Sequence, residues 1–202
     1  MLRDNNTKRY LAAASIASEL YRARTIAEEL SITSKNARAL AVRAGSSAAG
    51  FNEITNFIEG LAKMTIETAN RVNNQAVELT RSASVLSRTQ DFLKRLQRSL
   101  QHQHCSDNNQ LKQIIEQTNH QLDDISERSE QLSAHLALEL DETGRDLRST
   151  KIVTVVARVE SARADKNVQV ALNAVADRVA NAGDRIKRHI DKALKTLNEE
   201  LR

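Results

Sequence analysis

The chain contains no proline in 202 residues and only five glycines. Proline breaks helix interiors, so its absence permits very long helices. Tryptophan is also missing, aromatic residues make up 2% of the chain, and the apolar residues are mostly alanine, leucine, valine and isoleucine. A compact globular core uses larger side chains, whereas this composition suits close-packed helix seams. We therefore expect an elongated all-α protein.

Cys105 is the one cysteine, which excludes an internal disulfide and fits a reducing cytosol. The longest apolar runs are a few residues, far short of the ~18 that span a bilayer. The first ten residues are polar and lack the apolar core of a signal peptide. We expect a cytoplasmic protein without a membrane span.

The charges carry a net +4, with acidic and basic residues interspersed as on solvated helix faces. One basic concentration lies near the C-terminus: Arg185, Lys187, Arg188, His189, Lys192 and Lys195. No aromatic residue accompanies it for base stacking, and no nucleic-acid-binding motif is present, so the sequence disfavours a nucleic-acid role.

The clearest periodicity lies between residues 54 and 100, where seam residues alternate at spacings of four and three. This heptad pattern predicts a helix that winds with partners into a left-handed bundle. The seam is leucine-rich from Leu79 to Leu100 and polar between Thr65 and Gln75. Polar seam residues either specify register or form a soft segment. For a soft segment, we expect slower hydrogen exchange in the leucine-rich part.

The same spacing predicts three further helices, over about 16–44, from 111 to about 162, and over 172–197. The β-branched run Ile152–Val156 favours a strand locally, but regular seams on both sides favour helix. Breaks fall at Gly45–Gly50, near His104–Asn109 and near Asp165–Asn167, where glycine or short polar residues allow reversal.

These elements predict one domain, 1–202, built as an elongated antiparallel four-helix bundle (coiled coil). Hairpin 1 covers about 1–104 with its tip near 45–50, and hairpin 2 covers about 108–202 with its tip near 164–168. Because the arms between breaks are similar in length, we expect the first and third turns at the same end.

Two segments of the chain are variants of one motif. The first, at 36–51, is N-A-R-A-L-A-V-R-A-G-S-S-A-A-G-F, with the spacing R-A-G-x4-G-F. It resembles the signalling tip of bacterial chemoreceptors (methyl-accepting chemotaxis proteins), a family whose tip has the same spacing. Ile54 and Ile58 fall on family valines, while Leu40, Ser46 and Phe57 stand where acids are usual. The second, V-A-R-V-E-S-A-R-A-D-K-N at 156–167, matches before its turn but lacks the turn glycines and the phenylalanine.

The resemblance implies a single chain that mimics a dimer of receptor hairpins and binds the chemotaxis histidine kinase and its coupling protein, with receptor tips as further partners. Phe51, Ile54 and Ile58 would offer an apolar face, and Arg43, Glu160 and Arg163 polar contacts, since arginine binds carboxylates in a bidentate way. Alternatively, Phe51 plugs the bundle end and the two arginines are solvated helix ends. We expect a monomer or weak homo-oligomer.

Other groups of residues give weaker indications of function. Glu/Gln pairs at Glu130–Gln131, Glu28–Glu29 and Glu116–Gln117 resemble receptor methylation sites, but such pairs are common on solvated helices. His102, His104, Cys105 and Asp107 lack the spacing of a preformed metal site. No nucleophile with its base and no phosphate-binding loop appears, so we expect no enzyme, cofactor, metal or small-molecule substrate. The sequence favours a chemoreceptor-like docking protein; the alternative is a structural or adaptor bundle without a chemotaxis role.

Overall fold

The computed structural model describes residues 2–48, 50–101 and 108–200 and confirms an all-α helical bundle. Among these residues there is no strand. The helices are α1 (Leu2–Ala44), the short 3-10 helix η1 (Gly45–Ala48), α2 (Phe51–Leu100), α3 (Asn109–Asp146), α4 (Ser149–Arg163) and α5 (Lys166–Glu200).

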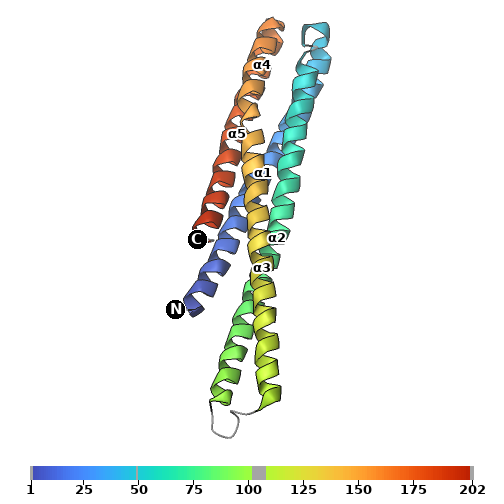
Figure 1. Cartoon of the computed structure of the whole chain (residues 1–202). Helices are drawn as coiled ribbons and strands as arrows, with labels where there is room; N and C mark the ends of the chain where they lie inside the picture. Colours follow the sequence, from blue (N-terminus) through green and yellow to red (C-terminus); the bar gives the residue numbers. More distant parts are fainter. Residues whose placement is uncertain (1, 49, 102–107, 201–202) are drawn as a thin grey trace.

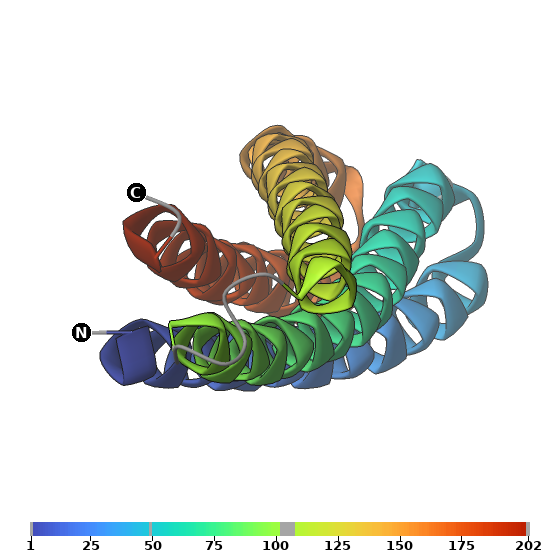
Figure 2. The ribbon, with the colours of Figure 1, turned by 60° about the horizontal axis from the view of Figure 1, so that its bottom comes forward.

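The molecule is a long rod (Figure 1). α1 runs to one end, the chain reverses at η1, and α2 runs the whole length back. With 50 residues, α2 is about 75 Å long. α3 and α4 return side by side with α2, and α5 packs against α1 and α4. In the upper part of Figure 1, α1, α2 and α5 pack with α4 and the adjoining end of α3, and we call this the four-helix part; the lower part consists of α2 and α3. Figure 2 turns the rod so that this lower part comes forward.

The core of the four-helix part combines small and large side chains. Ala23, Ala27 and Ala41 of α1 are at most 1% exposed, which lets neighbouring helices approach closely. Aliphatic side chains fill the space between the helices; the fully buried ones include Ile16, Leu20, Leu30, Ile58, Val72, Leu136, Leu140, Leu172, Val179, Ile186 and Ile190.

The polar seam of α2 lies inside this core. Thr65 and Thr68 are 1% and 2% exposed, and the Thr65 hydroxyl donates to the carbonyl of Leu61 at 2.9 Å. By contrast, four leucines of the leucine-rich seam, at 79, 93, 96 and 100, are only partly buried, and Leu86 is the buried one at 7% exposed. The polar segment is the better buried part of the seam, because α1 and α3 pack against it. Burial therefore favours slower exchange in the polar segment, the opposite order to the one that we expected from the leucine-rich seam.

The predicted third helix is interrupted. It is helical through Asp146, but Arg148, Thr150 and Lys151 donate to the carbonyl three residues back rather than four. This short stretch of tighter helix separates α3 from α4, two helices that both pack against α5. Ile152–Val156 is helical, as predicted.

The other breaks fall close to their predicted places. Gly45 has φ +66, a left-handed conformation that glycine adopts without strain, and it ends α1. Asn108 caps α3, its side chain accepting from the amide of Leu111 at 3.1 Å. His102, His104, Cys105 and Asp107 lie outside the described residues.

Candidate protein-binding surface

The two turns that carry the tip-like motifs lie at the same end of the rod, as predicted (Figure 1). We call this end the tip end. There, η1 contacts α4, and a Cβ built on Gly50 would lie 2.6 Å from Oε2 of Glu160. The first turn and the second hairpin therefore touch, and the glycine leaves room for the Glu160 carboxylate.

Three of the predicted binding residues are not on the surface. Phe51 is 0% exposed, Ile58 1% and Ile54 6%, so they do not form the exposed apolar face that we predicted. Each lies on the inward side of α2, and Phe51 closes the bundle at its first turn. The alternative that Phe51 plugs the bundle end describes the structure.

The charged candidates lie on the surface near both turns. Arg163 pairs with Glu160 of its own helix at 2.9 Å, and the arginine side chain is 70% exposed. Arg43, in the last turn of α1, is exposed. Both arginines are accessible to a partner.

α4 presents a surface that the sequence did not single out as a site. Ile152, Val155, Val156 and Val159 are 68%, 60%, 45% and 51% exposed. Their spacing of i, i+3, i+4 and i+7 places them on one side of the helix, which we call the α4 aliphatic face. The side turned into the bundle carries small and hydroxyl residues instead: Thr150, Thr154, Ala157 and Ser161.

α4 therefore exposes its aliphatic side and buries its small and hydroxyl side chains, the reverse of an ordinary bundle helix. A surface helix normally turns its aliphatic side inward, so the exposed arrangement has a cost in water that a partner would remove. The sequence signal for this exposed face was the run Ile152–Val156. We used its β-branched residues only to decide between a strand and a helix.

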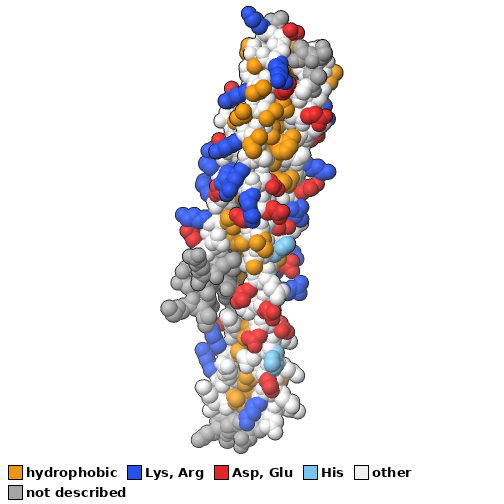
Figure 3. Space-filling model, turned by 45° about the horizontal axis from the view of Figure 1, so that its top comes forward, with side chains coloured by type: hydrophobic (Ala, Val, Ile, Leu, Met, Phe, Trp, Pro, Cys, Tyr) orange, Lys and Arg blue, Asp and Glu red, His pale blue; other side chains and the backbone are white. Residues whose placement is uncertain are grey.

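A groove of about 420 Å³ lies next to this face, between α2 and the junction of α3 and α4. Phe57, Gly60 and Met64 line it on one side and Asp146 and Ser149 on the other. The Phe57 side chain is 45% exposed. Figure 3 shows hydrophobic side chains gathered over this part of the molecule.

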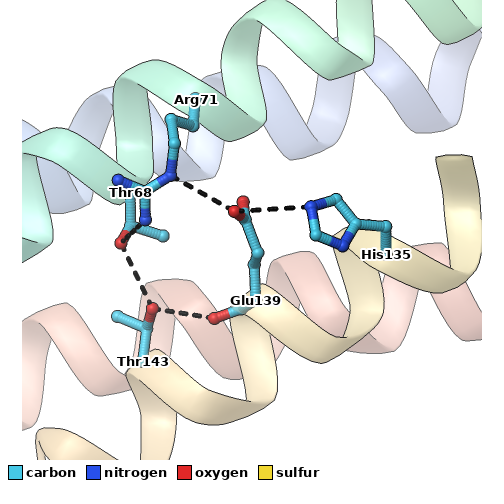
Figure 4. A network of polar contacts seen from close by, with 5 residues as sticks. All are labelled: Thr68, Arg71, His135, Glu139 and Thr143. Atoms are coloured by element: carbon cyan, nitrogen blue, oxygen red, sulfur yellow. Dashed lines mark hydrogen bonds and ion pairs between the residues drawn. The ribbon is translucent and has the colours of Figure 1, made fainter.

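Below the groove, a polar network joins α2 to α3 (Figure 4). Arg71 donates from Nε to Oε1 of Glu139 at 3.2 Å and from Nη2 to the hydroxyl of Thr68 at 3.1 Å. His135 lies 3.7 Å from the same carboxylate oxygen, and Thr143 donates to the Glu139 carbonyl at 2.8 Å. These contacts join α2 and α3 at a fixed register.

A close polar contact joins α5 to α1. His189 Nδ1 and Glu19 Oε2 are 2.6 Å apart and largely buried. This hydrogen bond holds the pKa of the Glu19 carboxyl below its usual value of 4.5, helped by the charges of His189, Lys192 and Arg22 and opposed by burial. Of the basic C-terminal cluster, Lys187 and Lys195 pair with acids one turn later, at Asp191 and Glu199.

The described residues contain no group of three or more His, Cys, Asp or Glu side chains placed to hold a metal ion. Their helices also include none with an apolar stretch sufficient to cross a bilayer. The residues of the methylation hypothesis that lie on exposed helix surfaces include Glu28, Glu29, Glu116, Glu130 and Gln131. Methylation requires this exposure, but Glu and Gln are ordinarily exposed on any solvated helix.

The tip end thus combines two adjacent turns with an exposed aliphatic helix face and a groove beside it. Comparisons with known proteins find no matching family model, no matching curated protein and no matching solved structure.

Proposed function

We propose that this chain is a non-catalytic signalling protein that docks partner proteins at its tip end. The observation that carries the proposal is the α4 aliphatic face. Four branched side chains exposed on one side of a helix, beside a groove with Phe57 at its edge, suit burial against an apolar surface of a partner.

For the partner, the resemblance of the two tip motifs supports the chemotaxis histidine kinase with its coupling protein. The shared position of both motifs at one end supports it too, since a receptor dimer also presents two tips together. In this proposal one chain supplies both hairpins, and it acts in the cytoplasm. The alternative is a structural or adaptor bundle that uses the same surface for other proteins.

The structure shifts the proposed contact from the residues that we first expected. Phe51, Ile54 and Ile58 hold the tip together from inside, which positions α2 and η1. The contact itself would come from α4, with Phe57 of α2 beside it, a residue that stands where the family has an acid. This departure enlarges the apolar part of the surface.

The test is a titration of the purified chain with a chemotaxis kinase–coupling-protein complex, comparing Val156→Glu with Val77→Glu. Both valines are 45% exposed, so both variants add the same charge at equal accessibility, and Val77 lies on α2 in the middle of the rod. Removal of an apolar anchor from an interface costs about 2 kcal/mol or more. We expect Val156→Glu to weaken binding at least ~tenfold and Val77→Glu to leave it unchanged.

No binding by the wild-type chain, where a receptor tip binds, would refute the chemotaxis role and favour the adaptor alternative. Equal binding by both variants would support the proposed partner but show that the α4 aliphatic face is not part of the interface. Circular dichroism of each variant shows whether the helices are intact.

A further inference from the structure

The end of the rod opposite the tip end has a groove between its two helices. We define the distal hairpin as residues 78–100 of α2 and 109–130 of α3, and it lies in the lower part of Figure 1. The groove has a volume of about 250 Å³, with Val85 and Ile125 in its lining. Because two helices cover only one side of each other, a position beside their seam stays open.

α2 carries a second stripe of residues beside its buried seam. Its members alternate at spacings of four and three, as seam residues do: Arg81, Val85, Arg88, Phe92 and Arg95. Val85 and Phe92 are 48% and 50% exposed. The three arginines, which we call the arginine row, are exposed residues. A helix with two adjacent seams packs against two neighbours, and nothing that the structure describes covers this second stripe.

α3 forms the other wall of the groove. Ile114 is 43% exposed and lies three turns before Ile125, on the same side of α3. Arg128 pairs with Glu78 of α2 at 3.3 Å, and both residues line the groove. From Glu78 to Arg95 the α2 wall is about 25 Å long, which matches a helix of about 17 residues.

The charge on the α2 wall is not neutralised within the described part of the chain. The arginine row forms no ion pair there, and Asp91, the acid of α2 nearest to it, pairs with Lys94 at 3.6 Å. The exposed rim of α3 is different, since it carries the neutral Gln117 and Gln121 and the acidic Asp124. The groove therefore has apolar walls, one basic rim and one rim that is nearly neutral.

We infer that this groove binds an acidic amphipathic helix of another protein. Aliphatic side chains of that helix would contact Val85, Phe92 and Ile114, and Asp or Glu residues on its flank facing α2 would pair with the arginine row. The bound helix completes a three-helix bundle and covers the second stripe of α2. A membrane surface would meet the arginine row without filling the groove, so the apolar walls favour a helix. This site is separate from the docking surface proposed at the tip end.

The experiment measures fluorescence anisotropy of a labelled peptide titrated with the full-length chain. The probe is a synthetic helical peptide of about 18 residues with leucines at seam spacing, glutamates on one flank and glutamines on the other. A second peptide has lysines in place of the glutamates. The wild-type chain binds the glutamate peptide, with a dissociation constant that rises about tenfold or more between roughly 50 and 500 mM salt. It binds the lysine peptide at least ~tenfold more weakly.

Two double variants separate the arginine row from net charge. Arg81→Glu with Arg88→Glu weakens binding of the glutamate peptide at least ~tenfold and prefers the lysine peptide. The matched control, Lys35→Glu with Lys112→Glu, makes the same change in net charge at exposed positions and binds like the wild-type chain. Lys35 lies on α1, and Lys112 lies two residues before Ile114, on the opposite side of α3.

Two single variants test the apolar wall and the tip end. Val85→Ser, at a half-exposed position, weakens binding of the glutamate peptide without changing its salt dependence, and Val156→Glu at the tip end leaves this binding unchanged. No binding of the glutamate peptide at low salt overturns the inference. Equal binding of both peptides by the wild-type chain, or of the glutamate peptide by both double variants, overturns it as well. Cosedimentation with phosphatidylserine vesicles in place of peptide binding would assign the arginine row to a membrane surface instead.

Discussion

Gly183 of α5 lies against Thr150 of α4 with no room for a side chain. A Cβ added at Gly183 would lie 2.5 Å from Cγ2 and 2.9 Å from Cβ of Thr150. Rotation about χ1 removes the first contact but not the second, because the Thr150 Cβ is fixed to the backbone. Gly183→Ala therefore forces α4 and α5 apart.

Two terms decide the result. Alanine gains about 1 kcal/mol over glycine inside a helix, and overpacking of a well-packed site costs about 1–3 kcal/mol. With a cost near the middle of that range, we expect Gly183→Ala to be destabilised by about 1 kcal/mol. Gly60→Ala is the matched control, since an added Cβ there meets nothing within 4 Å, and it should be stabilised by about 1 kcal/mol.

The assay is thermal and urea unfolding followed by circular dichroism at 222 nm. The two variants should differ by about 2 kcal/mol, or roughly 4–8 °C in Tm for a chain of this size. Thr150→Ala in the Gly183→Ala background removes the Cγ2 contact and should recover part of the loss, as a double-mutant cycle would show. If Gly183→Ala is as stable as Gly60→Ala, the close approach of α4 and α5 is wrong.

Three further predictions follow from burial and charge. Phe51→Ala should lower the free energy of unfolding by about 3–5 kcal/mol, because it empties a fully buried site; a loss below 1 kcal/mol would contradict its place in the core. Amide hydrogen exchange should be slower over 54–76 than over 88–100, and the reverse order would mean that α1 does not cover the polar seam. The depressed pKa of Glu19 means that its ionised form stabilises the fold above pH 4.5, and that this stabilisation is lost as pH falls through the folded-state pKa. The difference in unfolding free energy between wild type and Glu19→Gln should therefore shrink below pH 4.5, whereas a constant difference would show that the His189 contact does not perturb this carboxyl.

The architecture was predictable because it depends on residue spacing. The absence of proline, the regular seams and the short polar or glycine-containing breaks predict long helices that reverse three times, and within the described residues the long helices begin and end close to these breaks. The interruption at Leu147–Arg148 was not predictable. It lies between two helices, α3 and α4, that both pack against α5, and neither of the two residues is a glycine or a proline.

The candidate surface was harder to predict, because heptad spacing identifies an apolar side of a helix but not what covers it. Phe51 follows the family motif and lies inside, whereas Val155 and Val159 of α4 face water. Exposure differs because the number of helices that pack together changes along the rod, and this number depends on where α1 and α5 end. The same cause leaves Leu93 and Leu96 half-buried and covers the polar Thr65 and Thr68 completely.

The most direct test of the central claim, that the tip end is the docking surface, is site-specific photo-crosslinking. A benzophenone maleimide is attached to single cysteines placed at Ile152, Val156 or Val77 in a Cys105→Ser background, and each chain is irradiated with the kinase–coupling-protein complex. We expect adducts from positions 152 and 156 and none from position 77. Adducts from position 77 alone, or none from any position under conditions of measurable binding, would contradict the claim.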